Sequence, residues 1–120
     1  MRDELTPATK LIFHGYDFAI PDGRGICHFG PWLKPTFDLR KFPDQAGAAK
    51  VVKEMLLRFA TMLAQLAMAH TDVLFVNAQG TLAPTSSSWH NELHPTKKGF
   101  QQFAERFQKE LKQLFPQKVL

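Results

Sequence analysis

The segment LIFHGYD at residues 11–17 and the segment VLFVNAQG at residues 73–80 decide the fold of this 120-residue chain. Each begins with a short, uninterrupted apolar run, then turns polar and contains a glycine. Continuous apolar runs of this length are typical of parallel strands that are buried on both faces. We therefore predict two parallel strands, over residues 11–13 and 73–76, whose polar carboxyl ends meet at one edge of a sheet.

Two amphipathic stretches accompany the strands. Between the strands, apolar residues recur at helical spacing from about Asp44 to Ala69, and Asp44 is a suitable N-cap. After the second strand, a stripe of apolar residues from Phe100 to Phe115 predicts a final helix packed into the core. Pro95 suits the first position of that helix, and a second proline follows its end.

The stretch over residues 18–43 is rich in proline and glycine and is predicted to be one long loop. Long connections without secondary structure often carry functional sites in compact domains. The predicted order is then strand, loop, helix, strand, loop, helix, which indicates an α/β fold with a right-handed crossover.

Two parallel strands make a poor sheet by themselves, because both would be edge strands although their composition favours burial. We therefore expect residues 1–120 to form a single α/β domain with parallel strands and flanking helices. Its sheet is either incomplete in this chain or completed by oligomerisation.

Composition limits the classes of function. Lys and Arg number 15 against 11 Asp and Glu, which gives a net charge of +4, and this mild excess permits a phosphate-bearing partner without requiring one. The aromatic residues are expected to face the core, so a small nucleic-acid binder is the weakest alternative and no nucleic-acid partner is predicted. No apolar run is long enough to cross a membrane, and the first residues lack a signal-peptide pattern, so we predict a cytoplasmic protein without a membrane partner. The single cysteine, Cys27, can form no internal disulfide.

The densest group of polar residues is WHNELHPT at residues 89–96. His94 stands beyond the carboxyl end of the second strand and just before the last helix, which is the side on which open α/β sheets bind ligands. An imidazole there can act as a general base near neutral pH, or it can simply cap the helix.

This block, followed by Gly99 and Phe100, resembles the last conserved block of the SGNH (GDSL-type) hydrolases, in which an Asp-x-x-His-Pro segment supplies the acid and the base. The segment FHGYDFAIPDGRG at residues 13–25, followed by GPWL at residues 30–33, is similar to the central strand and loop of some bacterial members. The resemblance extends from about Lys10 to Phe115 and corresponds to the C-terminal half of such a domain. It implies a flavodoxin-like three-layer fold and the hydrolysis of esters, thioesters or acetyl groups.

The same resemblance implies a serine nucleophile in a Gly-Asp-Ser block and an oxyanion hole from two middle blocks, and this sequence contains none of them. His94 would then be the general base, with Asn91 in the place of the usual Asp. An amide orients the ring but carries no charge, and in a serine protease this replacement costs roughly 10⁴-fold in turnover. Asp17 is a weaker candidate for the missing acid. Ser86, Ser87 and Ser88 are weak candidates for a local nucleophile, because no strained turn presents them.

The residues expected to shape the substrate pocket are His14, Tyr16, Asp17, Trp32 and Trp89. No metal site is predicted, since the i,i+4 pair His90 and His94 is interrupted by the following proline and no cysteine pair exists. No cofactor is predicted either.

Two functions remain open from the sequence. The first is a fragment or subunit of an SGNH-type hydrolase, weak or inactive alone, whose partners are an ester or acylated small molecule and a missing N-terminal half or second copy. The second is a non-catalytic α/β interaction module that self-associates through its sheet edge.

Overall fold

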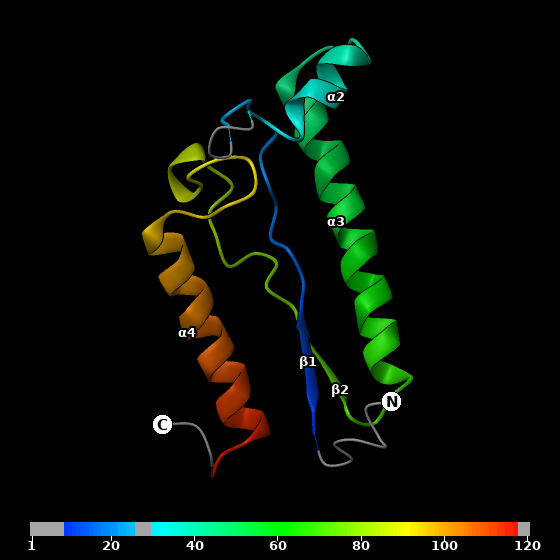
Figure 1. Cartoon of the computed structure of the whole chain (residues 1–120), viewed down its shortest axis with the longest axis vertical. Helices are drawn as coiled ribbons and strands as arrows, with labels where there is room; N and C mark the ends of the chain where they lie inside the picture. The colour runs from blue at the N-terminus through cyan, green and yellow to red at the C-terminus, as the bar shows by residue number, and fades with distance from the viewer. Residues whose placement is uncertain (1–8, 26–29, 118–120) are drawn as a thin grey trace.

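A computed structural model describes residues 9–25 and 30–117 of the chain (Figure 1). Its elements, in order, are β1 (Leu11–His14), α2 (Lys34–Leu39), α3 (Gln45–Met68), β2 (Val73–Val76), a short 3₁₀ turn (Ser86–Ser88) and α4 (Lys97–Leu114). The predicted α/β class, with two short strands and two long helices, is confirmed.

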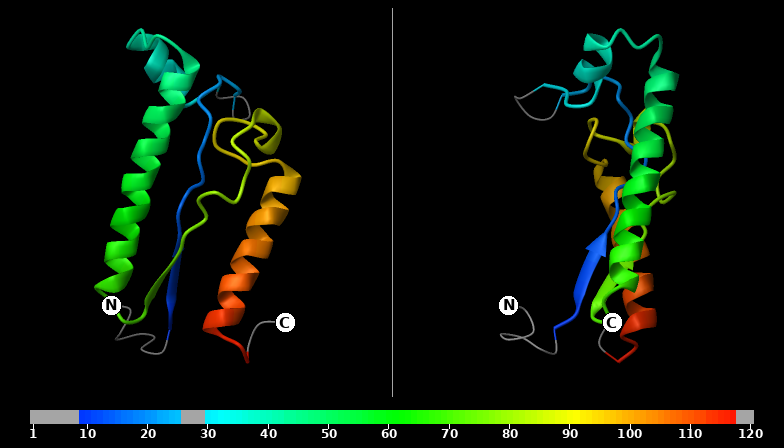
Figure 2. Two further views of the ribbon diagram at one scale, coloured as in Figure 1. Left: turned by 180° about the vertical axis from the view of Figure 1, so that it is seen from behind. Right: turned by 90° about the vertical axis from the view of Figure 1, so that its right-hand side faces the viewer.

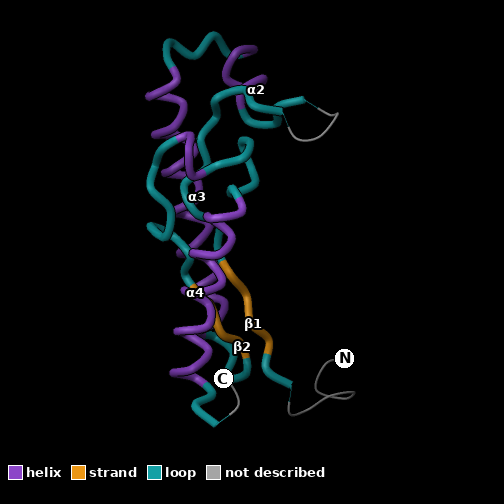
Figure 3. The backbone as a smooth tube through the Cα atoms, turned by 90° about the vertical axis from the view of Figure 1, so that its left-hand side faces the viewer, coloured by secondary structure: helices purple, strands orange, loops and turns teal. Residues whose placement is uncertain are grey.

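The two strands pair in parallel, in a register that sets Leu11 beside Val73 and His14 beside Val76. They lie between α3 and α4, which gives three layers (Figure 1). The side views in Figures 2 and 3 show β1 on the outer side of β2. Within the described residues the sheet has no further strand, so one edge of β1 is free.

The long helix α3 begins where the sequence predicts. Asp44 has an extended backbone and its Oδ1 accepts the amide of Gly47 at 2.6 Å, which satisfies one of the unpaired donors of the first turn.

The last helix begins two residues later than predicted. Thr96 is the N-cap of α4, with its hydroxyl accepting the amide of Gly99 at 3.2 Å, and Pro95 lies before the helix. Pro95 instead forms an antiparallel bridge with Trp89. A β-carbon added at Gly99 would lie 2.8 Å from Pro95 Cβ and 3.0 Å from the carbonyl oxygen of Ser88, so only glycine lets the helix approach this loop so closely.

The prediction of one long loop over residues 18–43 is wrong in part, because α2 forms inside it. Pro35 occupies the first turn of α2, where its missing amide breaks no helical hydrogen bond, so a residue that reads as a helix breaker here helps to start a helix.

The prediction that both strands are buried on both faces is wrong for β1. Leu11, Ile12 and Phe13 are each between 37% and 39% exposed, whereas Val73 and Val76 of β2 are buried. The buried cluster of Ala19, Val52, Leu82 and Trp89 combines the loops that follow the strands with one residue of α3, and β1 contributes no residue to it. The phenylalanine stripe of α4 is also not wholly in the core, since Phe100 is 53% exposed.

No helix in the described part of the chain is long and apolar enough to cross a membrane. Cys27, the single cysteine, lies outside the described residues.

Candidate functional site

A cavity of about 330 Å³ opens between the carboxyl end of β1 and α4. Most of its wall is apolar, and the apolar part comes from Ala78, Trp89, Pro95, Phe100, Phe103, Ala104 and Phe107. Its polar wall contains the imidazoles of His14 and His94 together with Tyr16 and Asp17. Five of the seven side chains expected from the sequence to carry or border the chemistry therefore line one cavity, namely His14, Tyr16, Asp17, Trp89 and His94.

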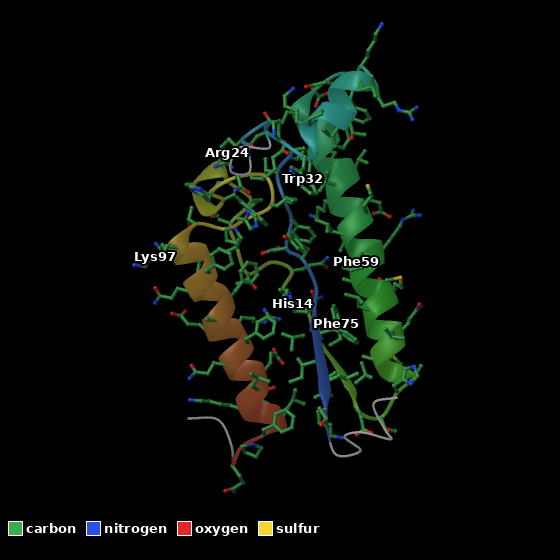
Figure 4. The ribbon with its side chains drawn as sticks, in the orientation of Figure 1. His14, Arg24, Trp32, Phe59, Phe75 and Lys97 are labelled. Atoms are coloured by element: carbon green, nitrogen blue, oxygen red, sulfur yellow. The ribbon has the colours of Figure 1, made fainter. Side chains whose placement is uncertain are left out.

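The two exceptions are Asn91, which reaches the site only through its contact with His94, and Trp32. Trp32 is 62% exposed and does not line the cavity, although its backbone amide belongs to the loop that supports the site (Figure 4). The expectation that its indole helps to form the pocket is not supported by its position.

His94 is held by Asn91, in the arrangement that the resemblance to an Asp-x-x-His-Pro block implies. Asn91 Oδ1 accepts the backbone amides of Leu93 and His94 at 2.9 and 2.8 Å, and it lies 3.1 Å from Nδ1 of His94. Two backbone donors identify the oxygen of this amide, so Nδ1 must carry a hydrogen to make the third contact. The other ring nitrogen, Nε2, is then an acceptor, which is the form that a general base requires.

His14 has a similar arrangement at the end of β1. Its Nδ1 lies 3.1 Å from the carbonyl oxygen of Gly15, and its ring packs edge-on against Phe107 of α4 with the ring centres 5.4 Å apart (Figure 4). Tyr16 donates its hydroxyl to the carbonyl oxygen of Leu93 at 3.2 Å. The ring contact of His14 with Phe107 attaches the end of β1 to α4, and the hydrogen bond of Tyr16 attaches it to the histidine loop.

Asp17 is not arranged as the acid for His94. Its side chain is almost fully buried, Oδ1 accepts the amides of Phe18 and Gly80, and Oδ2 accepts the amide of Leu82. Because both oxygens serve backbone donors, this carboxylate holds the turn after β2 against the end of β1.

Glu92 has a larger structural role that sequence reasoning missed. It is fully buried, and its Oε1 accepts the amides of Gly23 and Lys34 at 2.9 and 3.0 Å. Its Oε2 accepts the amides of Trp32 and Leu33, both at 2.7 Å. Four amide donors on one carboxylate bind the histidine loop to the loop that precedes α2. The sequence gives little hint of this role, because Glu92 stands in a block, WHNELHPT at residues 89–96, that is already rich in polar residues.

Arg24 makes a second connection between the same loops (Figure 4). Its Nη1 donates to the carbonyl oxygens of Ser86 and Trp89, and its Nε donates to Asp22 Oδ2 at 2.7 Å. Glu92 and Arg24 together hold the segment from Ser86 to Glu92, which leads directly to His94.

Trp89 is buried to 1% exposure, and its Nε1 has no hydrogen-bond partner within the described residues. An unpaired buried donor lowers stability, and the burial of the large apolar ring offsets that loss.

The site has no nucleophile of its own in the described chain. Ser86, Ser87 and Ser88 form the 3₁₀ turn and do not line the cavity. Across residues 9–25 and 30–117, no group of three or more His, Cys, Asp or Glu side chains is placed to hold a metal ion.

Comparison with known proteins finds no family model, no curated protein and no solved structure that matches this chain.

Proposed function

We propose that this chain supplies the histidine side of an SGNH-type hydrolase site, with the serine nucleophile and the oxyanion donors coming from polypeptide outside it. The finer fold belongs to the same proposal: a flavodoxin-like three-layer domain of which this chain is the C-terminal half. The observation that carries the proposal is the Asn91–His94 contact of 3.1 Å, which leaves Nε2 of an exposed imidazole bare beside an apolar cavity.

The chemistry follows from that geometry. Nε2 of His94 takes the proton of a serine hydroxyl as its oxygen attacks the ester carbonyl, and the ring later gives the proton to the leaving alcohol. Asn91 Oδ1 keeps Nδ1 protonated and the ring in place throughout. Since the amide has no charge, it stabilises the imidazolium less than a carboxylate would.

The network around Glu92 and Arg24 supports the same proposal. A general base must be held within hydrogen-bond reach of its target, and loops can do this only when other contacts hold them. Here four amides on Glu92 and two carbonyls on Arg24 restrain the loop that carries His94.

The purified chain alone should hydrolyse a chromogenic short-chain ester no faster than an equal concentration of imidazole. Turnover well above that rate, lost in His94→Ala, would mean that a nucleophile lies within this chain and would contradict the incomplete site.

The positive test combines the chain with a polypeptide that carries the Gly-Asp-Ser and oxyanion blocks of an SGNH hydrolase. We expect ester hydrolysis that disappears in His94→Ala and persists in His90→Ala, the matched change at a second exposed histidine of the same loop. A stable complex whose ester hydrolysis is unchanged in His94→Ala would exclude the proposed role of His94.

A further inference from the structure

The chain exposes an unusually large surface for its size. The accessible surface is 8662 Å², whereas a compact monomer of 13.7 kDa exposes roughly 6,600 Å². The radius of gyration of 17.0 Å likewise exceeds the value of about 14 Å for a compact 120-residue domain.

Much of the exposed apolar surface lies along β1 and the helices beside it. Figure 1 looks onto the free edge of β1 with α4 on one side and α3 on the other. All three apolar side chains of β1 are more than a third exposed. One stripe of α3 is exposed as well, and it consists of Met55 (63%), Phe59 (42%), Met62 (53%) and Leu66 (42%).

The free edge of β1 offers unpaired backbone groups. Leu11 and Gly15 donate their amides toward β2, to the carbonyl oxygens of Asp72 and Val76. Because alternate residues of a strand direct their backbone groups to opposite edges, the amides and carbonyls of Ile12 and His14 point to the free edge. The strand has no proline, lysine or bulge of the kind that blunts exposed edges.

We propose that this surface binds a second copy of the chain, with the two β1 strands pairing antiparallel around a two-fold axis at Phe13. In this register Ile12 and the partner's His14 exchange backbone hydrogen bonds on both sides of the axis, and the sheet becomes four-stranded. This proposal does not rest on the hydrolase site, and it competes with the proposed half-domain in one respect, because a β1 edge that binds a second copy cannot also pair with strands of an N-terminal half.

Charge and area favour a second copy as the occupant. Residues 11–16 contain no Asp, Glu, Lys or Arg, so symmetric pairing sets no formal like charges opposite each other. The excess of 8662 Å² over the compact value is roughly 2,000 Å² per chain, or about 4,000 Å² for two chains, and obligate homodimers bury about 2,000 to 5,000 Å² in total.

Sedimentation of the full chain between 1 and 100 µM, roughly the range in which such dimers are measured, tests the proposal. We expect a species of twice the chain mass, and Phe13→Lys should raise the dissociation constant at least about a hundredfold, because it removes two apolar rings and sets two cations at the axis. Leu39→Lys, which adds the same charge to an 81% exposed residue of α2, is the matched control and should leave the mass unchanged.

Hydrogen exchange of the wild-type chain gives a second measurement that does not depend on how a variant folds. The amides of Ile12 and His14 should be protected, and the protection should rise with protein concentration. A wild-type monomer at the highest concentration, a monomer that assembles only with a different polypeptide, an open-ended aggregate, or rapid exchange at both amides would overturn the proposal.

Discussion

The junction around Glu92 and the outer strand β1 differ in how completely their groups are satisfied. At the junction, a fully buried carboxylate accepts four amides, and Asp17 accepts three more nearby. At β1, apolar side chains are exposed and one edge of backbone groups has no described partner. The difference teaches that the histidine loop is held by hydrogen bonds within the chain, whereas the edge of β1 has backbone groups for which the described chain supplies no partner.

The largest expected effect lies at the junction. Glu92→Gln replaces one acceptor oxygen by a donor that faces two backbone amides, so we expect the free energy of unfolding to fall by about 3 to 5 kcal/mol. Urea unfolding followed by circular dichroism measures it. Glu54→Gln, at an exposed ion pair on α3, is the control and should change stability by less than about 0.5 kcal/mol. Equal losses of stability in the two variants would show that the hydrogen bonds of Glu92 stabilise the chain no more than an exposed ion pair does.

The close approach of α4 to the histidine loop gives the next effect. Alanine usually stabilises a helix relative to glycine, but in Gly99→Ala the new carbon meets Pro95 and the carbonyl of Ser88. We expect a loss of about 1 to 3 kcal/mol from overpacking. A gain in thermal stability would show that α4 is free to move away from the loop.

Trp89, in the wall of the cavity, separates the effect of a buried ring from the effect of an unpaired donor. Trp89→Phe keeps most of the buried ring and removes the unpaired Nε1 donor, so the stability should change by less than about 1 kcal/mol. Trp89→Ala, measured in the same unfolding series, should cost about 3 to 5 kcal/mol because it leaves a large void. Comparable losses in both variants would mean that the donor has a partner that matters.

The smallest effect is expected on the exposed stripe of α3. Met55→Gln changes a residue that is 63% exposed in the single chain, so the stability of the monomer, measured by urea unfolding at low protein concentration, should shift by less than about 0.5 kcal/mol. A loss above 1.5 kcal/mol at high protein concentration that vanishes on dilution would show that this stripe is covered by a partner.

Local patterns predicted much of the fold. The apolar runs located both strands, and helical spacing with Asp44 located α3 within a residue of its ends. The pairing of Asn91 with His94 was also expected, because the resemblance of residues 91–95 to an Asp-x-x-His-Pro block implies it.

What the sequence could not show depends on contacts between distant segments. Glu92 meets amides about sixty to seventy residues away, and no local pattern marks a carboxylate for that role. Pro35 and Pro95 misled for a related reason, because proline fits several positions near a helix start and neighbouring packing selects among them. The exposure of β1 was hidden as well, since an apolar run indicates only that burial is favourable.

The tautomer of His94 tests the central claim most directly. Two-bond proton–nitrogen correlation spectra of the full chain, recorded where the ring is neutral, distinguish the two ring nitrogens. We predict that Nδ1 carries the hydrogen and Nε2 is bare, and that Asn91→Ala abolishes this preference. A hydrogen on Nε2 in the wild-type chain would contradict the account, because that nitrogen could not take a proton from a hydroxyl.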